Sequence, residues 1–226
     1  MFKKFLPLAA AASIAILAST AANASSIQAY YSFNGGAITA LTDADGNAAD
    51  QSFSFFGAIA GTTFNFNLVS GFSQGATPDL LFAQTSNTHT GTLADTIKIY
   101  LVATGLTPGG SQTFTSQLSS NFFNPVGQSL TERTYLGSPF APGTLLASET
   151  LGSLAVVSET QNASPGDLYS LTAEFEITSS VNGGNSGGQI NVSAVPGPIV
   201  GAGLPGLIAA CGGLLALARR RRKQAI

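Results

Sequence analysis

The stretch LTAEFEITS, residues 171–179, decides the fold class. Every second residue from Leu171 to Ile177 is apolar, and the residues between them are Thr or Glu. Successive side chains of a β-strand point to opposite faces, so this alternation predicts a strand with one dry and one wet face.

The same alternation recurs along the middle of the chain, between clusters of Gly, Asn, Asp and Pro. The stretches are QSFSFFG (51–57), TTFNFNLVS (62–70), DTIKIYLVA (95–103), SQTFTSQL (111–118), TLLASETL (144–151) and GQINVSAV (188–195). Short strands at such spacing, without a long helical stripe, predict an all-β domain, either an antiparallel β-sandwich or a jelly-roll-like fold. We expect Asn182–Gln189 to form a loop rather than a linker, followed by a last strand over Gln189–Val195.

The N-terminus has the pattern of a secretory signal peptide. Lys3 and Lys4 precede an apolar run that ends in Ala-Asn-Ala. This order predicts export by the Sec machinery and cleavage by signal peptidase between Ala24 and Ser25. The alternative is an uncleaved membrane anchor, for which the apolar run is short.

The charges are distributed unevenly. Between Ser25 and Val195 the only cations are Lys98 and Arg133, whereas all eleven acidic residues of the chain lie there, giving 2 − 11 = −9. Such a body disfavours nucleic acid as a partner, because no cations offset the phosphate charge. The single cysteine, Cys211, lies in the C-terminal apolar run, so the middle of the chain has no disulfide.

Residues 199–218 are free of charge and long enough, at about 30 Å, to cross a bilayer as a transmembrane helix. A basic tail follows at 219–223, and the positive-inside rule predicts that it stays cytoplasmic. The alternatives are an ordinary single-span anchor and a buried apolar helix.

The C-terminal segment resembles the PEP-CTERM sorting domain of bacterial exported proteins. The resemblance rests on a short proline motif, the glycine-bearing helix and the terminal arginine cluster: Val195, Pro196, Gly197, Pro198, Arg219, Arg220, Arg221 and Arg222. Gly197 stands where the motif usually has Glu. The resemblance implies that an exosortase, a membrane transpeptidase of Gram-negative bacteria, removes the tail. It also implies a setting of extracellular polysaccharide.

The chain is thus divided into a signal peptide (1–24), an exported β-rich domain (25–194) and a sorting signal (195–226). The expected localisation is the inner membrane before processing, then the cell surface or extracellular matrix. The leading prediction is a non-enzymatic envelope or matrix protein, associated with extracellular polysaccharide and with no catalytic residues.

Two constellations support alternatives to that prediction. Glu174 and Glu176 share a strand face at roughly 6.6 Å, near the spacing of carboxylates in inverting glycosidases, so a secreted polysaccharide-acting enzyme is the second hypothesis.

His89 is the only histidine, and one histidine is too few for a zinc site. No serine lies in a nucleophile elbow, and we expect His89 in a loop.

Calcium is the one cofactor that the sequence raises. Asp43, Asp45, Asn47 and Asp50 place oxygen ligands at the spacing of a tight cation-binding loop. The stretch lacks the Gly and the final Glu of an EF-hand. A calcium-dependent binding module is therefore the third hypothesis. The alternative is a type I′ turn at Asp45-Gly46 that joins the flanking strands as a hairpin.

Overall fold

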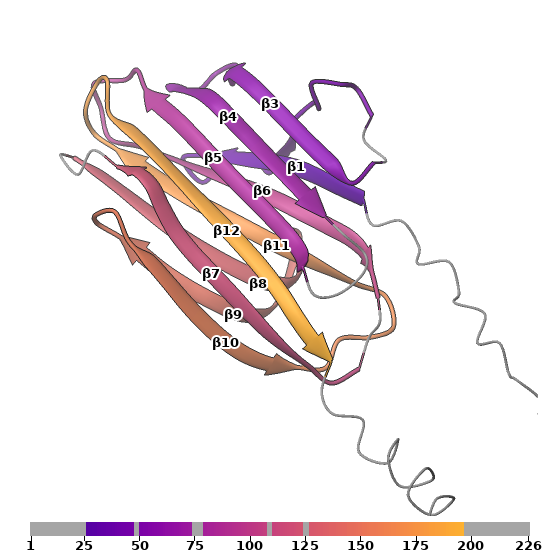
Figure 1. The fold of residues 1–226 in the computed structure, drawn as a ribbon. Helices are drawn as coiled ribbons and strands as arrows, with labels where there is room; N and C mark the ends of the chain where they lie inside the picture. Colours follow the sequence, from indigo (N-terminus) through magenta and orange to yellow (C-terminus); the bar gives the residue numbers. More distant parts are fainter. Residues whose placement is uncertain (1–25, 48–49, 74–78, 108–109, 124–126, 197–226) are drawn as a thin grey trace, which may run out of the picture.

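The computed structural model describes residues 26–47, 50–73, 79–107, 110–123 and 127–196, which form two antiparallel six-stranded sheets packed face to face (Figure 1). Sheet A has the order β2 (Thr39–Ala40), β1 (Ser26–Phe33), β6 (Asp95–Leu106), β11 (Tyr169–Ser179), β8 (Gln128–Ser138) and β9 (Ala141–Leu151). Sheet B has the order β10 (Val156–Ala163), β7 (Gln112–Phe123), β12 (Asn185–Pro196), β5 (Asp79–His89), β4 (Phe64–Ser73) and β3 (Ser52–Ala58).

The strand order is that of a jelly roll with an N-terminal extension. From β5 onward, β5-β12-β7-β10 lie side by side in sheet B, and β6-β11-β8-β9 lie side by side in sheet A. This arrangement of eight strands wraps the chain back and forth between the sheets. β1 and β2 extend sheet A, while β3 and β4 extend sheet B. The predicted all-β sandwich is confirmed.

The core lies between the sheets and follows the alternation of the strands. In β11, all four apolar residues of the opening stretch are fully buried (Leu171, Ala173, Phe175 and Ile177). From sheet B, Phe64, Phe66 and Phe114 are buried to the same extent. Burial of one such side chain stabilises the fold by about 1.5–3 kcal/mol, so this single apolar layer holds the two sheets together.

Part of the interior is polar. Glu132 and Thr134 of β8 point inward and are fully buried, as is Asn87 of β5. The hydroxyl oxygens of Ser116 and Thr134 lie 2.7 Å apart and hydrogen-bond one sheet to the other. These inward polar residues interrupt the apolar alternation, which is why β5 and β8 escape the sequence pattern.

The last strand begins earlier than predicted. β12 starts at Asn185, so the expected loop over Asn182–Gln189 is mostly strand. Gly188 is suited to this strand because a Cβ there would collide with the carboxylate of Glu132 on the facing sheet. Glycine at this position therefore reflects close packing between the sheets rather than a flexible loop.

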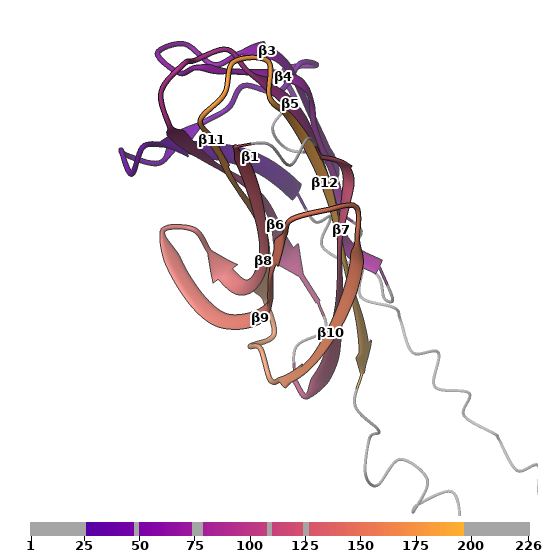
Figure 2. The same ribbon diagram turned by 90° about the vertical axis from the view of Figure 1, so that its left-hand side faces the viewer.

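The β8–β9 hairpin curls outward and back over the outer face of sheet A (Figure 2). Thr172 on that face donates a hydrogen bond of 2.7 Å to the carbonyl of Gly137 in the hairpin. At the hairpin tip, Phe140 contacts Tyr30 of β1 edge to face, with ring centroids 5.1 Å apart. The hairpin thus covers part of sheet A.

The terminal predictions lie outside the described residues, namely the signal peptide 1–24, the helix 199–218 and the basic tail 219–223. The described part of the chain contains no helix with the length and hydropathy of a membrane span. Val195 and Pro196, counted with the sorting signal, belong to β12, where Pro196 is opposite Gln112 of β7. The strand therefore crosses the predicted boundary at residue 194.

Candidate functional site

The outer face of sheet B is a broad surface of uncharged polar side chains. Alternation turns their apolar neighbours inward and leaves these residues facing outward, in register across five strands. We call this surface the polar face: Asn65, Asn67, Ser70, Gln84, Ser86, Thr88, Thr113, Thr115, Gln117, Ser158, Thr160, Asn162, Asn185, Gln189, Asn191 and Ser193. None of the outward side chains described in sheet B is charged.

A hollow of about 370 Å³ interrupts the polar face over β4, β5 and β12. Asn67, Ser86, Thr88 and Asn185 line it. The pairing of β4 with β5 shifts between Phe66 and Leu68, so Asn67 occupies a bulge. Bulges re-aim side chains, and this one brings the Asn67 amide to the rim of the hollow.

The lining groups of the hollow keep free hydrogen-bonding capacity. Thr88 donates to the side-chain oxygen of Asn185 at 2.5 Å, which leaves the Asn185 amide NH₂ as a donor. The side chains of Asn67 and Ser86 make no hydrogen bond to any other described residue. The hollow thus offers both donors and acceptors, and no charge, to a ligand.

Two phenylalanines are neighbours on the same outer surface, and we call Phe72 and Phe82 the phenylalanine patch. Phe72 of β4 is 45% exposed; the 59% exposed Phe56 of β3 is not part of the patch, because it lies four residues along β3 from Ser52, the partner of Phe72. Phe82 of β5 is half-buried and lies directly opposite Phe72 in the strand register. Exposed aromatic rings grouped on an uncharged surface mark a site for a partner with an apolar face.

The outer face of sheet A has a different chemistry, dominated by a network of four charges. Lys98 lies 3.2 Å from both Glu174 and Glu176, and Arg133 lies 2.7 Å and 2.6 Å from the same two carboxylates. Glu174 and Glu176 do share one face, as the sequence predicted, but the cations were not foreseen as their partners. They come from β6 and β8, the two neighbours of β11.

Glu176 does not suit the role of the general acid in a glycosidase. An inverting glycosidase needs one carboxylic acid with a raised pKa as its general acid. Burial raises the pKa of Glu176, but hydrogen bonds from Arg133 and Lys98 outweigh it and hold that pKa below the ordinary value. The pairing therefore keeps Glu176 ionised and hydrogen-bonded, which suits a structural role.

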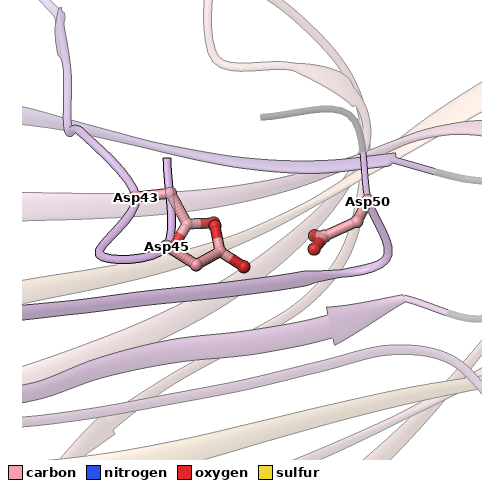
Figure 3. Close-up of side chains that lie close together, drawn as sticks. All are labelled: Asp43, Asp45 and Asp50. Atoms are coloured by element: carbon pink, nitrogen blue, oxygen red, sulfur yellow. The ribbon is translucent and has the colours of Figure 1, made fainter. Parts of the chain in front are cut away.

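The acidic loop between β2 and β3 brings Asp43, Asp45 and Asp50 together (Figure 3). One carboxylate oxygen from each lies within 4.8 Å of the other two. Asp43 is buried, and its Oδ1 accepts a hydrogen bond of 3.1 Å from the Ser54 backbone N–H. Its Oδ2 is also buried and has no hydrogen-bond partner among the described residues.

These carboxylates fit the requirements of a calcium ion. Calcium ligands lie about 2.3–2.6 Å from the ion, so two ligands of one ion are at most about 5 Å apart. A buried carboxylate oxygen without a partner is costly, and a bound cation would satisfy it. Asn47 has another role here, because its amide nitrogen donates to Asp50 at 3.3 Å. The triad can therefore hold a metal ion.

The predicted type I′ hairpin at Asp45-Gly46 is wrong. A type I′ turn needs positive φ at both central residues, but Gly46 has φ of 75° and Asp45 is not in the positive region. The flanking strands also do not pair, since β2 belongs to sheet A and β3 to sheet B. The loop is instead a crossing between the sheets, with a turn closed by the Gly46 N–H on the Asp43 carbonyl.

The prediction that His89 lies in a loop is also wrong. His89 ends β5 and is fully buried. Its Nδ1 lies 2.9 Å from the carbonyl of Val181, and its Nε2 lies 3.4 Å from Asp95. The ring packs on Phe64 at 4.8 Å between centroids. The histidine is part of the core, out of reach of a substrate.

Comparisons with known proteins assign no family. No protein-family model matches the chain, and no curated protein matches it. It is similar to a solved structure described as "CBM4 structure and function", at 12% identity over 64% of this chain and 86% of that chain, with a TM-score of 0.30. It is also similar to TmCBM61 in complex with β-1,4-galactotriose, at 7% identity over 62% of this chain and 92% of that chain, with a TM-score of 0.24.

A third similar structure is the enzymatically active domain of tailspike protein 4 of bacteriophage CBA120. The identity is 12% and the TM-score 0.29, over 56% of this chain but only 18% of that chain. The three solved structures thus include carbohydrate-binding modules and an enzyme domain. These identities and TM-scores are too low to carry an argument about family or function.

Proposed function

We propose that this protein is an exported, non-catalytic module that binds extracellular polysaccharide through the polar face of sheet B. The observation that supports the proposal is the hollow lined by Asn67, Ser86, Thr88 and Asn185, with free donors and acceptors. Sugar hydroxyls both donate and accept hydrogen bonds, and amide and hydroxyl side chains match them in both respects. The phenylalanine patch supplies an apolar surface for the C–H face of a sugar ring.

The binding is proposed to be polyvalent. The polar face repeats the same side-chain chemistry across neighbouring strands spaced about 4.8 Å apart, so a long chain meets many equivalent groups. Each hydrogen bond contributes only about 1 kcal/mol, and several together give a useful affinity. This chemistry serves retention in a matrix, where the protein holds polymer without cleaving it.

Sedimentation with the extracellular polysaccharide of the native host tests the proposal. The protein is expected to pellet with that polysaccharide, and the size of the polymer should stay constant during long incubation. A steady fall in polymer size would show an enzyme instead. Protein that stays in the supernatant at all polymer concentrations would refute binding.

The proposal includes delivery by the two terminal signals. The signal peptide exports the body, the helix at 199–218 holds it at the inner membrane, and an exosortase-type enzyme releases it near the Val195–Pro198 motif. Support comes from the order of proline motif, apolar segment and arginine cluster in the sequence. Intact-mass measurement on protein from the host's culture medium and membranes tests this route.

A released form that begins at Ser25 and ends near Pro196 is the expected result, and such a cut leaves β12 whole. Membrane-bound protein that retains the terminal RRRRKQAI, with none released, would instead indicate a permanent anchor. The sorting proposal would then be abandoned, while the binding proposal would remain to be judged by sedimentation.

Calcium binding at Asp43, Asp45 and Asp50 is a second proposed property, supported by the buried, unpartnered Oδ2 of Asp43. The ion would stabilise the segment that crosses between the sheets, because it would neutralise three clustered carboxylates. A ligand that binds only the folded state stabilises it by about 2.7 kcal/mol when the free ligand concentration is one hundred times the dissociation constant. Calcium should therefore raise the melting temperature, and chelation should reverse the rise.

The variant Asp43→Asn provides the control, because its amide oxygen can still accept the Ser54 N–H while the ligating charge is lost. We expect its melting temperature to be insensitive to calcium. Asp167→Asn, in an exposed loop, should retain the full calcium effect. An identical calcium response in Asp43→Asn would remove this site.

A further inference from the structure

The absence of charge on the polar face restricts the class of polysaccharide, if the proposed function holds. The described body has two cations, Lys98 and Arg133, and both lie on the outer face of sheet A. Each is already paired with Glu174 and Glu176. An anionic glycan on sheet B would meet none of the described cations and would approach a strongly acidic body.

A cationic polymer is equally unsuited to this surface. Its charges would have no anion to pair with among the outward side chains that the structure describes in sheet B. Among the described side chains of sheet B the acidic one is Glu159 of β10, and its register opposite the buried Ser116 places it on the inner side of the sheet. Charge complementarity therefore favours a polymer with hydroxyl groups and no ionised groups.

The phenylalanine patch and the hollow lie along one line of the sheet. Phe82, Gln84, Ser86 and Thr88 project from the same side of β5, with Phe82 at one end and the hollow around Ser86 and Thr88 at the other. Six residues of extended strand separate Phe82 from Thr88, a distance of about 20 Å. This distance accommodates several consecutive sugar residues of an extended chain.

We infer that the ligand is an uncharged polysaccharide whose chain lies along β4 and β5, with one ring against the phenylalanine patch and another in the hollow. The aromatic rings exclude water from the C–H face of one sugar, and the amides of Asn67 and Asn185 hydrogen-bond the hydroxyls of another. Such an interface has no ionic component, so its affinity is insensitive to salt.

Affinity electrophoresis and calorimetry against two sets of soluble polymers test the inference. The uncharged set contains a β-glucan, a mannan and a galactan, and the anionic set contains alginate and polygalacturonate. We expect binding within the uncharged set only, with equal affinity at low and high salt. Phe72→Ala should weaken the affinity for the uncharged polymer about tenfold, which is the contribution expected of one aromatic contact.

Phe140→Ala is the matched control, because Phe140 is 61% exposed on the other side of the sandwich, against Tyr30. It should leave the affinity unchanged, whereas Asn67→Ala should weaken it. Preference for the anionic set, or a strong loss of affinity at high salt, would overturn the inference while leaving polysaccharide binding intact. Uncharged binding that survives both Phe72→Ala and Asn67→Ala would place the ligand elsewhere. Failure to bind any polymer in either set would overturn the proposed function as well.

Discussion

Glu132 makes the stability of this protein depend on pH in an unusual direction. Its carboxyl group is fully buried between the sheets, and neither oxygen makes a hydrogen bond of normal geometry to a described residue. Burial raises the pKa of Glu132 and backbone groups of Ser119 and Gln189 lower it by less, so that the pKa stands at about 9 rather than 4.5. At neutral pH the native protein therefore keeps this carboxyl protonated.

The sign of the effect follows from proton uptake. Between pH 4.5 and about 9 the native state holds a proton that the unfolded state has released. The contribution of Glu132 is therefore complete below pH 4.5 and is lost as the pH rises toward about 9. Each pH unit in this window costs about 1.4 kcal/mol, so the free energy of unfolding should fall on the order of 3 kcal/mol from pH 5 to pH 7.

The variant Glu132→Gln isolates this contribution, because glutamine has the size of the protonated acid and does not titrate. Urea unfolding followed by far-UV circular dichroism, at several pH values from 5 to 8, measures it. The native protein should lose stability over this range relative to Glu132→Gln, while Asp167→Asn, in an exposed loop, should parallel the native protein. Parallel curves for the native protein and Glu132→Gln would contradict this prediction, because Glu132 would then be ionised in both states.

Three further predictions concern packing and charge. Gly188→Ala should destabilise the fold by about 1–3 kcal/mol in urea unfolding, because the new Cβ collides with the buried carboxyl group of Glu132, whereas Gly152→Ala, with open space around it, should cost little. Glu174→Gln should lower the free energy of unfolding by about 1 kcal/mol. In a polysaccharide digestion assay both the native protein and this variant should leave the polymer size unchanged. Turnover by the native protein that is lost in Glu174→Gln would instead identify a catalytic carboxylate. The lowered pKa of Glu176 means that its ion pairs stabilise the fold above pH 4.5 and cease to do so as the pH falls through that lowered value. Acid unfolding of Glu176→Gln should thus lack this component, and an unchanged acid transition would contradict it.

Much of the fold was predictable because most core-facing residues of several strands are apolar, although β4 and β11 each end in a buried serine, Ser73 and Ser179. β11 and β4 are examples, with Phe175 and Phe66 inward and polar residues outward. β5 and β8 were missed where inward positions are polar, as at Asn87 and Glu132. Asn87 donates to Ser186 on the neighbouring strand β12, far along the chain, and Glu132 is buried without a partner among the described residues, so neither gives a local signal in the sequence.

The candidate sites differ in how far the sequence could reveal them. Asp43, Asp45 and Asp50 come from one short loop, so their proximity was predictable from spacing alone. The hollow instead joins Asn67 of β4 to Asn185 of β12, which meet only through the strand order of sheet B. Only β4 showed its polar side in the sequence, because Ser86 and Thr88 belong to β5, which was missed, and Asn185 lies in the stretch expected to be a loop.

Mapping the bound polysaccharide on the protein by NMR tests whether the polar face is the binding surface. Backbone amide shifts would be recorded while the extracellular polysaccharide of the native host, cut to soluble fragments, is added. We expect the largest changes on β4, β5 and β12, around Asn67 and Asn185. Changes centred on the outer face of sheet A, around Lys98 and Glu174, would contradict it, and so would the absence of any change.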